Sequence, residues 1–155
     1  MQSVYATPAY ISALDQVMPV AEQIKVDFEI RGCPVNTHQI TTVLRSLLTG
    51  VIPVDAQDKL CLECKRQNRV CVMVSRGLPC MGSVIWTGCG VLCLAVGRDC
   101  YGCYGSAENV NINSLSDQFG ALQLNPNQVG HRFLSFNSAD LAFKSVKPVS
   151  TEHDD

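Results

Sequence analysis

The sequence has few aromatic residues, little net charge and no long apolar run. Aromatic residues make up 6% of the 155 residues, too few for the stacking platforms that bind single-stranded nucleic acid. The formal net charge is −2 and no long run carries one sign, which argues against nucleic acid or an anionic membrane surface as the main partner. No apolar stretch reaches the roughly 20 residues that cross a bilayer, so we expect no membrane span.

The amino terminus lacks the features of a secretory signal. Residues 1–19 have neither a positively charged start nor a compact apolar segment. We therefore expect a cytoplasmic protein, in a reducing compartment where structural disulfides are rare. The nine cysteines are also an odd number, which leaves one thiol unpaired in any scheme built from disulfides alone.

The residue groupings that make and break bonds are missing as well. There is no Ser/His/Asp set, no paired carboxylate constellation and no phosphate-binding glycine loop, so we expect no bond-making active site on this chain. None of the three histidines is expected to bind a metal, since one begins a helix and the others lie in a loop and a tail (His38, His131 and His153).

Cysteine is what the sequence has in abundance, and eight of the nine cysteines lie in one window, from Cys61 to Gly105. Their order is Cys61-x2-Cys64-x6-Cys71-x8-Cys80-x8-Cys89-x3-Cys93-x6-Cys100-x2-Cys103. Eight thiolates make two complete sets of four ligands, and Cys33 is left over upstream. The window also holds seven glycines, which leave little room for long helices or strands, so a bound group is expected to hold it together.

Zinc and iron–sulfur clusters are the two groups that take four thiolates. Structural zinc uses C-x2-C half-sites, but a zinc ribbon places its two half-sites about 15–20 residues apart, far closer than the two C-x2-C pairs here. Iron–sulfur clusters accept wider and more variable spacing. They also need backbone N–H groups near their sulfurs, which glycines permit, and a dry apolar shell, which the window supplies. The composition favours clusters, and a structural zinc-binding interaction module remains the alternative.

The region before the window has the pattern of an α/β unit. Lys25 to Ile30 alternates apolar and charged residues and predicts a half-buried strand. Asn36 with Gln39 predicts a capping box. A helix is then expected up to a stop at Gly50, with its apolar residues on one face: Ile40, Val43, Leu44, Leu47 and Leu48. After the window, residues 113–124 and 137–146 predict two short helices, the second capped by Asn137 or Ser138.

Several ordered motifs resemble one family. The segments EIRGCPVN, CLECKRQNRVC, LPCMGSVIWTGCGVLC and GRDCYGCYG are similar to the small, electron-transferring subunit of [NiFe] hydrogenases. The nearest branch is the delta-type subunit of cytoplasmic NAD(P)-linked hydrogenases and sulfhydrogenases, a group related to the 20 kDa subunit of NADH:ubiquinone oxidoreductase. The resemblance covers roughly Val26 to Leu141.

The resemblance implies a set of cluster ligands. One [4Fe–4S] cluster would be held by Cys61, Cys64, Cys71 and Cys80, and a second by Cys89, Cys93, Cys100 and Cys103. This division follows the order of the cysteines, and Cys80 and Cys89 are the two that could exchange places. Cys33, in the GCP motif, would be a single ligand of a third cluster, the one nearest nickel. The resemblance also implies that the family's flavodoxin-like domain, which supplies further ligands to that third cluster, would be nearly all missing from this chain.

The implied architecture is an α+β fold in three parts. Residues 1–55 would be the end of an α/β, flavodoxin-like domain, residues 56–148 an irregular, helix-poor cluster-binding domain, and residues 149–155 a disordered tail. The implied partners are the [NiFe] large subunit, a diaphorase-type NAD(P)/FAD subunit and a ferredoxin-like subunit. The chain would act as an oxidoreductase subunit, relaying electrons between the large subunit and these partners. A truncated, redox-inactive small subunit is the remaining alternative.

Overall fold

The computed structural model describes residue 7, residues 18–53 and residues 58–146. In chain order the helices are α1 (Val20–Gln23), α2 (Thr37–Leu48), α3 (Leu60–Arg66), α4 (Val72–Arg76), α5 (Leu92–Ala95), α6 (Ile112–Ala121) and α7 (Pro126–Leu134). Two 3-10 turns, η2 (Met81–Ser83) and η3 (Phe143–Ser145), complete the helical elements. The only β pairing in the described ranges is two isolated antiparallel bridges, Lys59 with Trp86 and Ile85 with Ser106.

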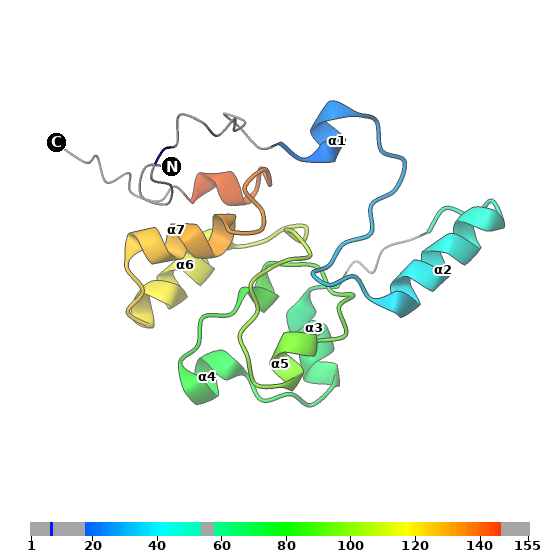
Figure 1. The fold of residues 1–155 in the computed structure, drawn as a ribbon. Helices are drawn as coiled ribbons and strands as arrows, with labels where there is room; N and C mark the ends of the chain where they lie inside the picture. Colours follow the sequence, from blue (N-terminus) through cyan, green and yellow to red (C-terminus); the bar gives the residue numbers. More distant parts are fainter. Residues whose placement is uncertain (1–6, 8–17, 54–57, 147–155) are drawn as a thin grey trace.

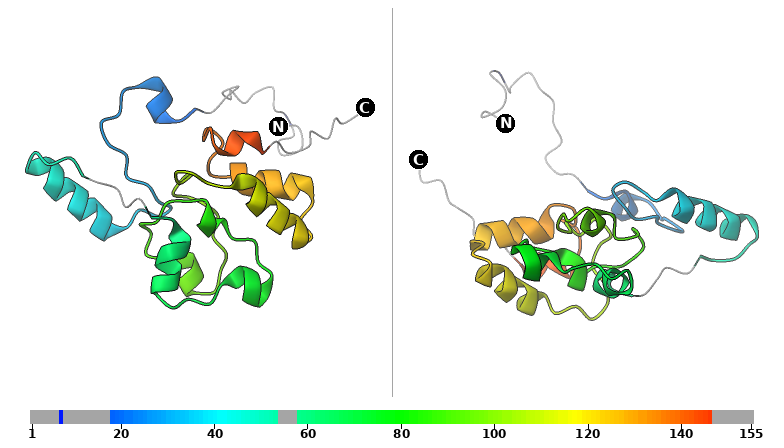
Figure 2. Two further views of the ribbon diagram at one scale, coloured as in Figure 1. Left: turned by 180° about the vertical axis from the view of Figure 1, so that it is seen from behind. Right: turned by 90° about the horizontal axis from the view of Figure 1, so that it is seen from below.

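The cysteine-rich window lies between two helical regions. Figure 1 shows the short helices α3, α4 and α5 grouped together, with α6 and α7 on one side and α2 standing off on the other. The two further views in Figure 2 show the same order along the molecule. The core lies in the window and its junction with α6, α7 and η3, and α2 contributes only Val43 to the buried apolar residues.

Helix α2 follows the predicted start and stop. Asn36 is the N-cap, and its side chain accepts a hydrogen bond from the N–H of His38. The helix ends at Leu48, and Gly50 follows with a φ of +72°, as a glycine stop requires. The predicted capping box does not form, because Asn36 accepts from His38 and not from Gln39, and the Gln39 side chain accepts from the Tyr104 hydroxyl at 2.9 Å.

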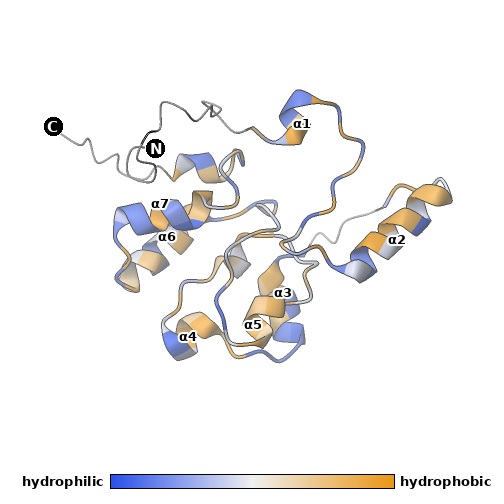
Figure 3. Cartoon of the chain, in the orientation of Figure 1, coloured by the Kyte–Doolittle hydropathy of each residue, from blue (hydrophilic) through white to orange (hydrophobic). Residues whose placement is uncertain are grey.

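The apolar face of α2 is mostly uncovered in the described structure. Val43 is 6% exposed, whereas Leu44, Leu47 and Leu48 are 52%, 49% and 86% exposed. Figure 3 shows the apolar colour running along this helix. The pattern therefore predicted the helix correctly, but tertiary packing buries only one residue of its apolar face.

The predicted strand at Lys25–Ile30 does not form. These residues are extended or bent between α1 and the GCP motif, with no ladder. A strand is stable only when a neighbouring strand takes its backbone hydrogen bonds, and none of the described residues pairs with this segment. The segment therefore alternates apolar and charged residues but lacks the backbone pairing that would make it a strand.

The segment after the window contains two helices, and the sequence predicted the position of only one of them correctly. Helix α6 matches the prediction for residues 113–124. The second helix is α7, which begins at Pro126 behind a capping box made by Asn125 and Gln128. The helix predicted for residues 137–146 is reduced to the turn η3. Asn137 does not cap it, since its side chain donates to the carbonyl of Gly102 at 2.9 Å.

Three phenylalanines tie the carboxyl-terminal elements together. The Phe133 ring on α7 lies 5.9 Å from Phe119 on α6 and 5.4 Å from Phe143 on η3, and all three side chains are fully buried. This cluster continues into the apolar residues of the window. The region is therefore fixed by ordinary hydrophobic packing.

Helices are the main regular structure and make up less than half of the described residues, which is compatible with the expected α+β class. Within the window no helix is longer than α3, with seven residues, as the glycines predicted. The term helix-poor fails after the window, where α6 and α7 have ten and nine residues. The flavodoxin-like assignment of residues 1–55 stays a prediction, and the expected tail 149–155 lies outside the described residues. No helix in the described ranges has the length and apolarity to span a membrane.

Candidate metal centre

The first four window cysteines gather around the start of three short helical elements. Cys61 and Cys64 lie three residues apart on α3, so they project from one side of that helix. Cys71 precedes α4 and Cys80 precedes η2. The turn η2 packs on α3, and a Cβ atom at Gly82 would lie 3.4 Å from the Cys61 sulfur and 3.5 Å from the Cys80 sulfur.

The thiols of this first group affect one another electrostatically. The pKa of Cys61 is raised to about 11, mainly by burial and further by the neighbouring Cys80, Cys64 and Cys71, while Lys65 opposes the shift. Burial likewise raises the pKa of Cys64, with Cys71 adding to the effect. Like charges so close together are unfavourable unless a cation is bound between them. The arrangement therefore suits a positively charged metal group.

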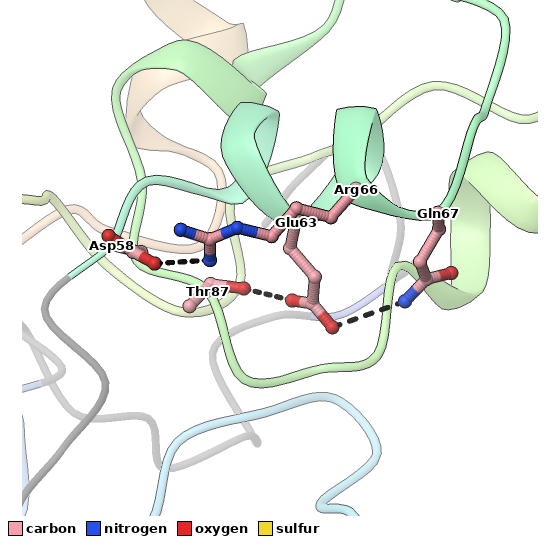
Figure 4. A network of polar contacts seen from close by, with 5 residues as sticks. All are labelled: Asp58, Glu63, Arg66, Gln67 and Thr87. Carbon is pink, nitrogen blue, oxygen red and sulfur yellow. Dashed lines mark hydrogen bonds and ion pairs between the residues drawn. The ribbon is translucent and has the colours of Figure 1, made fainter.

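Helix α3 is held in place from outside the thiol group. The N–H of Leu60 donates to the carbonyl of Ile85 at 3.1 Å, beside the Lys59–Trp86 bridge. Figure 4 shows the polar side of the helix, where Glu63 accepts hydrogen bonds from Thr87 and from Gln67. Thr87 lies two residues before Cys89. These contacts fix the helix that carries Cys61 and Cys64 to the loop that leads to the second group.

The last four window cysteines line a single cavity of about 150 Å³. Cys93 lies on α5, Cys89 precedes that helix, and Cys100 and Cys103 lie on the loop that follows it. Apolar and aromatic side chains make up most of the remaining wall: Leu60, Ile85, Val91, Leu92, Leu94, Tyr101, Tyr104 and Phe136. Such a lining excludes water from a bound group, and the dryness of the surroundings influences its reduction potential.

Cys33 lines the same cavity as this second group. The family resemblance implied that Cys33 serves a separate, third cluster, and in the structure its backbone N–H is directed at the sulfur of Cys103. Cys33 itself is exposed, at the turn before α2. Five thiols therefore border one cavity, one more than a cubane takes.

Backbone N–H groups point at four of the sulfurs. Burial raises the pKa of each of these thiols, and the N–H groups lower it in part. The pairs are Gly82 and Cys100 to Cys80, Val91 and Leu92 to Cys89, Gly102 to Cys100, and Cys33 to Cys103. Hydrogen bonds of this kind stabilise thiolates and help to set the potential of a cluster.

Gly102 shows why glycine is needed here. Its φ is +83°, a conformation that side chains rarely adopt, and its N–H is directed at the Cys100 sulfur. A Cβ atom at this position would lie 3.4 Å from a methyl carbon of Ile85 and 3.5 Å from Met81. These are ordinary contact distances, so it is the left-handed backbone, which a larger residue would strain, that requires glycine here.

The two thiol groups meet at Cys80 and Cys100. The N–H of Met81 donates to the carbonyl of Cys100 at 3.0 Å, and the N–H of Cys100 is directed at the Cys80 sulfur. The Cys80 thiol also raises the pKa of Cys100, in addition to the effect of burial. The groups are therefore neighbours joined by backbone hydrogen bonds, with Cys33 beside the second group.

All nine cysteines lie in the described part of the chain, and all are free thiols. The structure places Cys80 with the first group and at its border with the second, and Cys89 on the cavity of the second. No three His, Cys, Asp or Glu side chains in the described ranges converge tightly enough to hold a single metal ion. The two groups are thus more open than a site for one ion, and the assignment of their ligands stays a prediction.

The histidines lie apart from the thiols where the structure describes them. His38 borders a different cavity of about 270 Å³, beside Arg31 and Trp86. The sequence had suggested that His131 lies in a loop, but it belongs to α7. His153 lies outside the described residues. A residue that the sequence did not single out is Arg132, which contacts the loops of both thiol groups.

No family model matches the chain, but the chain is homologous to subunits of hydrogenases, which are oxidoreductases. It is 36% identical to the delta subunit of sulfhydrogenase 2 from Pyrococcus furiosus over 97 residues, which make up 63% of this chain and 41% of that protein. It is 31% identical to a subunit of the F420-non-reducing hydrogenase of Methanothermobacter thermautotrophicus over 115 residues, 61% of this chain and 37% of that protein.

A further relative is named as an iron-sulfur subunit. The iron-sulfur subunit of the F420-non-reducing hydrogenase of Archaeoglobus profundus is 28% identical over 120 residues, 59% of this chain and 37% of that protein. The chain spans about two fifths of the length of the curated relatives it matches. The similarity therefore connects this chain to a part of such subunits.

Proposed function

We propose that this chain is an iron–sulfur electron-transfer subunit, or part of one, of a cytoplasmic [NiFe] hydrogenase complex. It would carry two [4Fe–4S] clusters, one on each thiol group, and relay electrons between the nickel–iron large subunit and a flavin, NAD(P) or ferredoxin-type partner. When bound, such clusters accept and release single electrons. Hydrogen itself would be activated on another chain.

The observation that carries this proposal is the pair of adjoining thiol groups with backbone N–H groups directed at their sulfurs. A mononuclear zinc site needs four sulfurs about 2.3 Å from one ion. Neither thiol group converges to that extent in the described ranges. Apolar walls around the second group and buried sulfurs in both suit a redox centre kept from water.

The chain's residues have distinct tasks in this proposal. The four cysteines at the helix starts bind the first cluster: Cys61, Cys64, Cys71 and Cys80. The second cluster is bound by Cys89, Cys93, Cys100 and Cys103. Cys33 lies at the exposed side of the second group and would donate to a third cluster whose other ligands come from elsewhere in the assembly. The homologues' names support a hydrogenase as that assembly.

The function is tested on the native complex, purified anaerobically through a tag on this chain. The proposal expects the complex to contain nickel, and hydrogen gas to bleach the visible absorption of its clusters. The Cys100→Ser variant removes a proposed ligand of the second cluster. In that variant, hydrogen should reduce the first cluster more slowly than in the wild type. A chain that is purified without nickel, or whose colour hydrogen leaves unchanged, would refute the hydrogenase assignment. A colourless chain containing only zinc would favour the structural alternative.

A further inference from the structure

Arg132, near the end of α7, places its guanidinium between the loops that carry Cys80 and Cys100. Its side chain is 10% exposed and forms an ion pair with Asp99, whose side chain is 14% exposed. The same Nη2 atom donates to the carbonyl of Pro79 at 2.6 Å and lies 3.4 Å from the carbonyl of Cys100. One nitrogen therefore contacts the residue before Cys80, the residue before Cys100, and Cys100 itself.

These two loops belong to different thiol groups and are also joined by backbone contacts beside Cys80 and Cys100. There the N–H of Met81 donates to the carbonyl of Cys100, and the N–H of Cys100 is directed at the Cys80 sulfur. Arg132 adds a side-chain contact to this junction. We propose that Arg132 is a positioning residue that fixes the separation of the two cluster sites and so controls electron exchange between them. The proposal rests on the function proposed above.

The geometry of the contacts depends on arginine. All three contacts come from Nη2, and the planar, rigid guanidinium fixes where that nitrogen lies between the two loops. It also lies on an aromatic face, since its central carbon is 3.8 Å from the centre of the Tyr101 ring. Lysine keeps the charge but is a point donor on a flexible stem. Arg132→Lys therefore preserves the cation beside Asp99 and removes the fixed spacing.

The position of α7 does not depend on Arg132 alone. The next residue, Phe133, is fully buried and packs on Phe119 and Phe143. The helix begins with a capping box at its far end, Pro126 being the first helical residue. A change at Arg132 is therefore expected to act on the cysteine loops more than on the helix.

A matched control is available on the surface. Arg66 forms an ion pair with Asp58, and the two side chains are 66% and 42% exposed (Figure 4). This pair has the same chemistry as Arg132 with Asp99, but it connects no loop of the second group. Exposed pairs contribute little to stability. Arg66→Lys should therefore leave the cluster properties as they are in the wild type.

The experiment compares wild type, R132K and R66K as full chains reconstituted anaerobically with iron and sulfide. After reduction with dithionite, the EPR spectrum reports the magnetic interaction between the two reduced clusters, and a redox titration reports their potentials. We expect R132K to bind as much iron and sulfide as the wild type. It should lose part of the magnetic splitting and shift at least one potential, while R66K does neither.

The outcomes separate this inference from the proposed function. Full iron and sulfide in R132K, with wild-type splitting and potentials, would overturn the role of Arg132 and leave the cluster proposal standing. A wild type that binds no sulfide would overturn both. If R132K fails to bind clusters, Asp99→Asn decides the question, because it keeps the arginine and its carbonyl contacts. That variant should show a smaller change in splitting in the same direction, and unchanged splitting would refute the proposal.

Discussion

Phe133 gives the sharpest test of how the carboxyl-terminal elements are fixed to the cysteine-rich window. Its ring is fully buried on α7 and contacts Phe119 and Phe143 at centroid distances of 5.9 and 5.4 Å. The change Phe133→Leu keeps the site apolar and much of its volume, but removes both ring pairs. Phe133 also adjoins Arg132, so the change weakens the packing of the helix from which the Arg132 side chain reaches the loops.

The expected cost follows from these contacts. Each aromatic pair contributes about 0.5–1.5 kcal/mol beyond the burial of area, so the two pairs together account for about 1–3 kcal/mol. The changed shape adds up to about 1.5 kcal/mol. We therefore expect F133L to lower the free energy of unfolding by roughly 1–4.5 kcal/mol. At about 4 °C for each kcal/mol, the midpoint of melting should fall by roughly 4–18 °C.

The assay is the loss of helical circular dichroism in anaerobically reconstituted protein, heated at one fixed rate. Phe136→Leu is the matched control, because Phe136 is 53% exposed and makes one edge-on pair with Tyr101 at 6.4 Å. It should shift the midpoint by less than half as much as F133L. Equal shifts for the two variants would show that the ring cluster around Phe133 does not hold this region.

Three further predictions concern the thiols. Since burial raises the pKa of Cys61 to about 11, its thiol is protonated at neutral pH and must lose that proton to bind metal. The apparent affinity of the metal-free chain for cobalt(II), followed by thiolate charge-transfer absorption, should therefore rise between about pH 6.5 and 8.5, by about tenfold per pH unit for each proton released. A flat profile would mean that the bound thiols are already ionised. Cys80→Ser should lower bound iron from about eight to about four atoms per chain, whereas Cys33→Ser should keep about eight. Equal losses would place Cys33 among the ligands of the two clusters. Chelation of the metal should make residues 61–105 sensitive to protease, because ligation supplies the folding free energy of a segment with little regular structure. Protection that survives in the metal-free chain would contradict this.

Local signals in the sequence predicted some elements well. Helix α2 begins at an asparagine cap and ends before Gly50, because both features act on neighbouring backbone groups. The short helices of the window follow from its glycines in the same way. Helix α7 also had a local signal, the Asn125–Pro126–Gln128 start. This signal is stronger evidence for a helix than the features that predicted one at residues 137–146.

Features that depend on distant residues were not predictable. The alternation at Lys25–Ile30 indicates which side chains share a face, but it cannot say whether a neighbouring strand is present. Asn137 was expected to cap a helix, yet its side chain binds Gly102, and the Asp140 side chain binds Ser106. Both partners lie more than 30 residues earlier in the chain. The contact of Arg132 with Asp99 likewise joins residues 33 positions apart. No local pattern marks such pairs.

The features of the candidate site also divide into those that the sequence predicted and those that depend on long-range contacts. The cysteine spacing predicted two sets of four thiols, because the number of possible ligands can be counted in the sequence. It did not predict that Cys33 borders the cavity of the second group, or that the two groups meet at Cys80 and Cys100. Both facts arise from long-range contacts of the loop after α5, which meets the segment around Cys33 and also the residues at the start of η2.

The quantity of acid-labile sulfide in the anaerobically purified chain tests the central claim most directly. Two cubane clusters contain about eight inorganic sulfides and about eight irons per chain. The account predicts these amounts together with EPR signals after reduction by dithionite. Zinc in place of iron, with no labile sulfide and no EPR signal, would contradict it.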